Sequence, residues 1–134
     1  MLTRDELEDI AVNRFFLAQN RRDLATVYAS LAEDCVMRMP SNGFVYDGFA
    51  ALKIHLEDVH QTFPKVDFSD FVCTIDTDAQ RIAAHFRVVL TDTEGVDFVM
   101  RNANLFSINS SGLLEEIIIY TSAPVSKGFH VGSG

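Results

Sequence analysis

The sequence predicts a single α+β domain over residues 1–134, in which three N-terminal helices pack on a curved antiparallel sheet. Two observations lead to this fold class. Apolar residues recur at helical spacing over most of the first 62 residues, whereas the chain after Lys65 has four long segments rich in β-branched and aromatic residues. Short connections between these segments favour antiparallel pairing of consecutive strands. Helices on one face of a bent sheet leave a hollow between the layers, which is a natural place for a ligand.

The first two helices have recognisable starts. Thr3 and Glu6 have capping-box spacing, and apolar residues then follow at helical spacing, so we expect a helix from about Arg4 to Gln19. A second helix is expected from about Asp23, with its last buried apolar residue at Leu31.

The remaining elements follow from periodicity and from turn residues. A first strand is expected at Cys35–Met39, with a short extended piece at Phe44–Tyr46. The third helix should run from about Phe49 to Thr62, because its apolar residues form one stripe and Pro64 ends it. The four long strands are expected at Val66–Asp76, Arg81–Thr91, Val96–Asn109 and Leu113–Ser122. Residues 124–134 resemble a loosely ordered C-terminal tail.

Composition and charge exclude several classes of function. The chain is 48% hydrophobic and 22% charged, as expected for a globular domain, and its net charge is −8 without a basic cluster. We therefore expect neither nucleic acid nor a membrane as a partner. The N-terminus lacks a hydrophobic secretory core and no apolar run is long enough to cross a bilayer, so a cytoplasmic location is expected. The spacing of Cys35 and Cys73 and of the histidines fits no zinc or redox motif, so we expect no metal and no cofactor.

Several short patterns, in this order and spacing, resemble the NTF2-like superfamily and, within it, the SnoaL-like domains. The resemblance covers about residues 5–123, and its patterns are NRRDL at residues 20–24, AED at 32–34, YDG at 46–48, FP at 63–64, and LFSI at 105–108 followed by a turn at Gly112. It implies a cone-shaped, cystatin-like roll with a pocket for a small hydrophobic molecule of polyketide or steroid type. The superfamily contains isomerases, cyclases, dehydratases and non-catalytic binding domains, so membership does not choose a reaction.

The resemblance also shows which chemistry is missing. Ketosteroid isomerases of this superfamily use an aspartate base just before a proline, and this chain has Met39 at that position. Their tyrosine donor corresponds to Phe15, and their protonated aspartic acid corresponds to Asn104. A thioether and a phenyl ring transfer no proton, and an amide only donates a hydrogen bond. The resemblance therefore implies that the isomerase carboxylates are absent.

Three polar residues remain as candidates for the pocket. Period-two alternation along the penultimate strand places Asn102 and Asn104 on one inward face, where they either orient a ligand carbonyl or hydroxyl or bond to neighbouring protein groups. His60 either reaches the cavity edge as an acid–base group or lies on a partly solvated flank of the third helix. We predict Asn104 and His60 as the catalytic residues, and Asn102 as a ligand contact. The expected apolar wall consists of Phe15, Met37, Met39, Leu56, Phe86, Met100 and Phe106.

The last strand is apolar on both faces, because Ile118 and Tyr120 alternate with inward Ile117 and Ile119. A second copy of the chain is the simplest cover for the outer face, so a homodimer through that face is expected. Two functions remain open at this point. One is acid–base chemistry of isomerase, cyclase or dehydratase type, and the other is a non-catalytic module that binds a small molecule or a protein.

Overall fold

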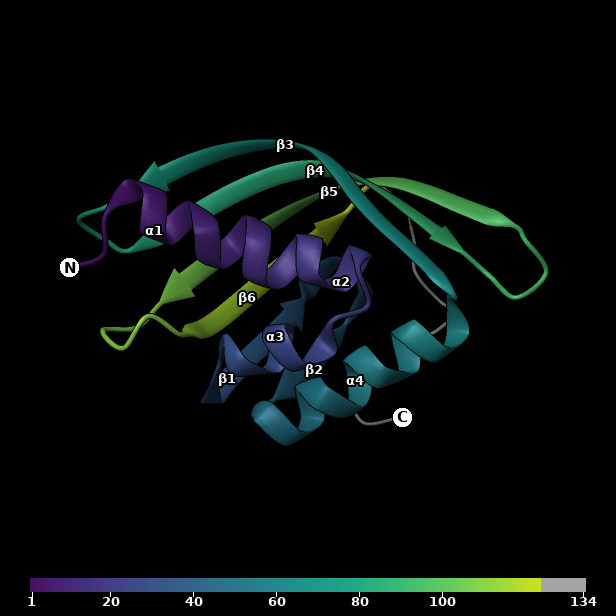
Figure 1. Ribbon diagram of the computed structural model, residues 1–134, viewed down its shortest axis with the longest axis horizontal. Helices are drawn as coiled ribbons and strands as arrows, with labels where there is room; N and C mark the ends of the chain where they lie inside the picture. The colour runs from purple at the N-terminus through teal and green to yellow at the C-terminus, as the bar shows by residue number, and fades with distance from the viewer. Residues whose placement is uncertain (124–134) are drawn as a thin grey trace.

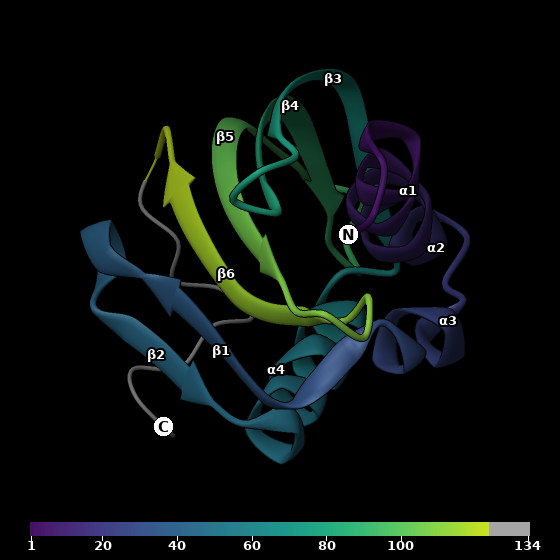
Figure 2. The ribbon, with the colours of Figure 1, turned by 90° about the vertical axis from the view of Figure 1, so that its left-hand side faces the viewer.

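A computed structural model describes residues 1–123 of the protein, and the predicted tail at 124–134 lies outside the described residues. Six strands form one sheet in the order β2-β1-β6-β5-β4-β3, and the helices lie on one side of it (Figures 1 and 2). The α+β fold class is therefore confirmed. The sheet bends around the helices, so its inner face is the concave one (Figure 2).

The first helix has nearly the predicted extent, but its middle part is a π-helix, which the sequence does not predict. Helix α1 (Arg4–Glu8), the π-helix η1 (Asp9–Leu17) and α2 (Ala18–Asn20) follow one another without a break, and together they are called the N-terminal helix below. The capping box is present, because the Glu6 N–H donates to Thr3 Oγ1 over 3.2 Å and the Thr3 N–H donates to Glu6 Oε1 over 3.0 Å. At the end of the π-helix the Ala18 N–H donates to the carbonyl of Asn13, five residues back.

The second helix is shorter than predicted. Helix α3 covers Leu24–Ala29, and strand β1 (Leu31–Met39) begins four residues before the predicted start at Cys35. Leu31 belongs to the sheet because it pairs with Leu114, and the Leu114 N–H donates to the carbonyl of Ser30 over 2.8 Å. Pairing with a strand far along the chain therefore overrides the helical spacing of Leu31.

The other elements lie within one residue of their predicted bounds, apart from a short 3₁₀ turn, η2 (Pro40–Asn42), that was not predicted. They are β2 (Phe44–Asp47), α4 (Phe49–Thr62), β3 (Lys65–Asp76), β4 (Arg81–Thr91), β5 (Asp97–Ile108) and β6 (Leu114–Thr121). Consecutive strands from β3 to β6 pair antiparallel, as expected. The expectation of a wholly antiparallel sheet is wrong, because β1 pairs with β6 in parallel.

The two long helices cover different parts of the sheet. The N-terminal helix packs against β3 and β4, whereas α4 packs against β1 and β2 (Figure 2). The middle strands β5 and β6 therefore face the region between the two helices. Arg22 ties the helices together, because its guanidinium donates to the carbonyls of His60, Phe63 and Pro64 at the end of α4 over 2.6–3.2 Å.

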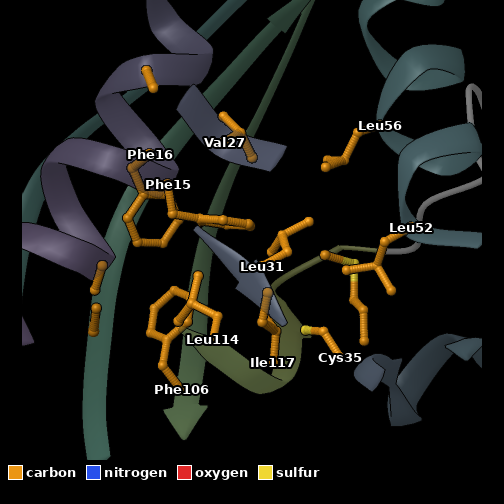
Figure 3. Close-up of a cluster of buried hydrophobic side chains, with 14 of the residues drawn as sticks. Phe15, Phe16, Val27, Leu31, Cys35, Leu52, Leu56, Phe106, Leu114 and Ile117 are labelled. Carbon is orange, nitrogen blue, oxygen red and sulfur yellow. The ribbon is translucent and has the colours of Figure 1, made fainter. Parts of the chain in front are cut away.

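An aromatic cluster fills one end of the interior. The Phe16 ring is fully buried and its centroid lies 4.4–5.5 Å from the centroids of five other rings, which belong to Phe15, Phe68, Phe71, Phe86 and Phe106. In Figure 3 the side chains of Phe15, on the N-terminal helix, and Leu56, on α4, point toward the same interior region from opposite sides. These contacts fix the distance between helix and sheet beside the cavity described next.

Candidate functional site

A cavity of about 70 Å³ lies between the two long helices and the inner face of the sheet. This volume is several times the roughly 10–15 Å³ that one water molecule requires. Its wall is formed by Phe15, Phe16, Gln19, Met37, Met39, His55, Leu56, Val59, Phe68, Phe86, Val88, Leu90, Met100, Asn102, Asn104, Ile119 and Thr121. Within the described residues, this wall contains no aspartate, glutamate, lysine or arginine, so the cavity is apolar with a few amide, hydroxyl and imidazole groups.

Asn102 and Asn104 form the polar part of the strand wall. They lie on β5 between inward residues of the neighbouring strands, with Asn102 opposite Phe86 and Asn104 opposite Ile119. Asn102 is 9% exposed and Asn104 is 2% exposed, and their side-chain oxygens lack a hydrogen-bond partner among residues 1–123. These oxygens therefore do not make the bonds to protein groups that the structural alternative requires. A buried polar group left unpaired costs about 1–3 kcal/mol, which makes both amides candidates for contact with a ligand.

All but one of the predicted apolar wall residues line the cavity. Met37 and Met39 from β1 line the cavity, as do Phe15, Leu56, Phe86 and Met100. Phe106 faces inward but does not line the cavity, which corrects the prediction for this residue. Its ring lies 5.5 Å from those of both Phe15 and Phe16, so it is covered by the aromatic cluster. The predicted roles of all these residues in ligand binding stay predictions.

His60 lies in the second layer of the cavity wall. It is 4% exposed, so it is not a solvated helix flank, and it is not among the residues that line the cavity. Its Nε2 lies 3.1 Å from Oε1 of Gln19, which does line the cavity. Burial, together with the positive charge of Arg22, lowers the pKa of His60 to about 4, so the ring is neutral near pH 7.

Nine residues of the cavity wall are not among the predicted contacts, and two of these, His55 and Gln19, are buried polar residues. His55 is 4% exposed, lines the cavity and stacks on Tyr46 with ring centroids 3.9 Å apart. It comes three residues after Leu52 and directly before Leu56, so a wider apolar face for α4 would have included it. Gln19 was treated as the end of a helix, and a polar residue in that place carries no signal of burial. It is nevertheless only 3% exposed.

Metal centres, membrane-spanning helices and reactive thiols would each indicate another class of site. Among residues 1–123, no group of three or more histidine, cysteine, aspartate or glutamate side chains is arranged to hold a metal ion. In the same part of the chain, no helix is both long and apolar enough to cross a membrane. Cys35 and Cys73 are free thiols, and burial, with the nearby charge of Asp34 as a lesser cause, raises the pKa of Cys35 to about 12.

The fold and the cavity define a class of protein, an α+β roll with an apolar cavity between its sheet and its helices. The SnoaL-like domain family matches residues 12–117, which is most of the chain, and the protein belongs to this family. No curated protein sequence matches the chain.

Solved structures share this fold at low sequence identity. A candidate polyketide cyclase from Xanthomonas campestris pv. campestris is 22% identical, with a TM-score of 0.75 over 87% of this chain and 90% of that chain. AusH from Aspergillus nidulans is 17% identical, with a TM-score of 0.77 over 96% of this chain and 91% of that chain. SalBIII, an epoxide hydrolase/cyclase-like enzyme with a role in pyran ring formation in the polyether salinomycin, is 14% identical, with a TM-score of 0.80 over 91% of this chain and 95% of that chain. At these identities the likeness shows the shared fold.

Proposed function

We propose that this protein binds a small, largely apolar ring compound, of the polyketide type to which the names of several structurally similar proteins refer, in the cavity between sheet and helices. The observation that carries the proposal is the pair of buried amides at Asn102 and Asn104, whose side-chain oxygens have no hydrogen-bond partner in residues 1–123. An apolar wall with a few polar groups at fixed places is the usual composition of a small-molecule site. A ligand hydroxyl at this wall would offset the desolvation of these oxygens.

The described cavity wall has no carboxylate, so any proton transfer there needs another side chain. His55 carries the one imidazole among the described lining residues, a group that can both give and take up a proton, and it touches the cavity directly. His60 reaches the cavity only through the Gln19 amide, which does not relay a proton. We therefore assign proton transfer to His55 in the catalytic form of the proposal, namely isomerase, cyclase or dehydratase chemistry. The catalytic roles predicted for His60 and Asn104 stay predictions.

The alternative is a module that binds a small molecule or a protein and catalyses nothing. The absence of any carboxylate from the described part of the cavity wall favours it. The resemblance to ketosteroid isomerases likewise implies Met39 at the position of their base. A general test is the exchange of the α-hydrogens of cyclohexanone with D₂O, followed by NMR. Exchange that is faster with the protein and is lost in His55→Ala supports an enzyme. Exchange at the buffer rate supports the binding module.

Ligand binding has a built-in readout, because the chain has four methionines. Met37, Met39 and Met100 line the cavity, whereas Met1 is 87% exposed. We expect 4-ethylphenol, added to protein labelled with ¹³C at the methionine methyl groups, to shift the three cavity signals and leave that of Met1 in place. No shift at millimolar ligand, or an equal shift at Met1, would contradict the proposal.

A matched pair of variants tests the amide wall. Asn104→Leu removes one amide from the cavity, and Ala103→Leu makes a leucine at the adjacent residue of β5, which is half-buried on the other face. We expect Asn104→Leu to weaken the binding of 4-ethylphenol about fivefold, the worth of one hydrogen bond, and Ala103→Leu to leave it unchanged. Equal affinities in the two variants would mean that Asn104 does not contact the ligand.

A further inference from the structure

We infer that Gln19 is the fixed hydrogen-bond donor of the cavity, that His60 is the positioning residue that holds it, and that the ligand therefore carries a ketone or similar acceptor oxygen. This inference rests on the proposed function, since it names the class of ligand for the same cavity. It assigns Gln19 a role in specificity, and it gives His60 a role other than acid–base catalysis.

The orientation of the Gln19 amide follows from its two neighbours. Its Nε2 donates to the carbonyl oxygen of Phe15 over 3.1 Å, and its Oε1 lies 3.1 Å from Nε2 of His60. A backbone carbonyl only accepts hydrogen bonds, so the nitrogen of the amide has to face Phe15 and the oxygen has to face His60. The reversed amide would set two oxygens against each other, and this excludes the ambiguity that usually attends a glutamine side chain.

The tautomer of His60 follows from the same contact. Because Gln19 Oε1 accepts, Nε2 of His60 carries the hydrogen, and the neutral ring keeps its lone pair on Nδ1. The backbone beside this ring is also held, since Arg22 Nη2 donates to the His60 carbonyl over 2.6 Å. His60 is therefore anchored at the end of α4, and it reaches across to the N-terminal helix to hold Gln19.

One N–H bond of the Gln19 amide remains available. The nitrogen has two hydrogens, and only one of them is used in a hydrogen bond among the described residues. Gln19 lines the cavity and is only 3% exposed, so solvent offers this donor little compensation. Asn102 and Asn104 differ from it, because their side-chain oxygens have no hydrogen-bond partner among residues 1–123 that would fix the orientation of the amides. The two asparagines can adapt to a donor or an acceptor, whereas Gln19 presents a donor and selects an acceptor oxygen.

Two probes of the same shape separate this inference from the proposed function. Acetophenone and α-methylstyrene differ in having C=O or C=CH₂ beside the ring, so only acetophenone accepts a hydrogen bond. We compare their dissociation constants, from the cavity methionine signals, in the wild type, in Gln19→Leu and in Gln61→Leu. Gln61 is an exposed glutamine on α4, so its variant is the matched control.

We expect Gln19→Leu to weaken the binding of acetophenone about fivefold relative to that of α-methylstyrene. Gln61→Leu should leave the ratio of the two dissociation constants unchanged. A ratio that Gln19→Leu does not change would overturn the inference while leaving the proposed function in place. Failure of both probes and of 4-ethylphenol to bind would instead contradict the proposed function, and the ligand contact of Gln19 with it.

A measurement on the wild-type protein covers the case in which Gln19→Leu does not fold. Acetophenone should shift the side-chain NH₂ signals of Gln19 in ¹⁵N-labelled protein, and α-methylstyrene should shift them much less. The ¹⁵N signals of His60 without ligand should show a hydrogen on Nε2 from pH 6 to 8. A hydrogen on Nδ1 instead, or equal Gln19 shifts with both probes, would overturn the assignment.

The positioning role of His60 is tested by His60→Phe, which keeps a buried ring but removes its hydrogen bond. We expect the preference for acetophenone to fall and the Gln19 NH₂ signals to broaden, because the amide is then held at one end only. An unchanged preference in a folded His60→Phe protein would show that the histidine does not position Gln19.

Discussion

The inner face of the sheet has two halves that differ in how closely their side chains are packed. The half beneath the N-terminal helix is filled by the aromatic cluster around Phe16, whose rings pack on one another and border the cavity on one side. The half between the helices carries methionines and two unpaired asparagine oxygens around a cavity. The packed half contributes stability, whereas the hollow half gives up stability for polar groups that the fold does not need.

The largest expected effect on stability comes from removing a ring from the aromatic cluster. Phe16→Ala should lower the free energy of unfolding by about 3–5 kcal/mol, because the ring is fully buried among five others. Urea denaturation followed by circular dichroism measures this change. The control is Val72→Ala on the outer face, which is 52% exposed and should change stability by less than about 1 kcal/mol. Similar losses in both variants would remove the contrast between packed and exposed positions.

The second expected effect is a pH dependence of stability that comes from His60, which lies behind the cavity wall. The pKa of His60 is about 4 in the folded protein, below its value of 6.5 in the unfolded chain, so the unfolded chain binds the extra proton between these values. Stability should therefore fall as the pH falls from about 6.5 to 4, by at most about 1.4 kcal/mol per pH unit from this group. The difference between wild type and His60→Phe isolates it from the carboxylates. Parallel stability curves for the two proteins would rule out a lowered pKa.

The third expected effect is a gain in stability when one amide is removed from the cavity wall. Asn104→Leu should raise the free energy of unfolding by about 1–2 kcal/mol, because it replaces a buried, unpaired amide with an apolar side chain of similar size. Thermal and urea unfolding measure the gain, and the binding assay with 4-ethylphenol measures the loss of function in the same variant. A destabilised Asn104→Leu protein would mean that the amide is satisfied in solution and belongs to the packed structure.

The smallest effect on stability is expected on the outer face, where Leu105 and Tyr120 are each 43% exposed. Within one chain, Leu105→Glu should change the free energy of unfolding by less than about 0.5 kcal/mol. The homodimer through this face stays a prediction, and sedimentation tests it. We expect a dimer for the wild type and a monomer for Leu105→Glu at micromolar concentration. A monomeric wild type would contradict the prediction of a dimer.

Local patterns predicted most of the fold. The stripe of α4 and its terminating Pro64 gave both ends of that helix, and alternation gave the long strands to within one residue. The parallel pairing of β1 with β6 was missed, as was the start of β1 at Leu31, because both depend on a partner strand about 80 residues away. The π-helix also left no sign in the apolar spacing.

The candidate site was predicted where strands form its wall and less well where helices do. A period of two places Asn102 and Asn104 on the inner face, whereas His55 and His60 lie five residues apart on α4, and the apolar spacing alone does not say which of them touches the cavity. The helical spacing also gives no sign of the partner of Arg14, which is exposed and donates to Asp9, five residues earlier, over 3.0 Å.

The place of β6 in the sheet sets the order in which the molecule can assemble. The strand lies between the β2–β1 pair and the β5–β4–β3 meander, and it is the last of the six strands in the chain. Until β6 is synthesised, no strand connects the two groups. During this time β1 lacks its partner, because β6 leaves the ribosome much later. Closing so long a loop slows folding. A chain that stops before Leu114 should therefore expose two incomplete sheet edges, which are sites for aggregation during synthesis.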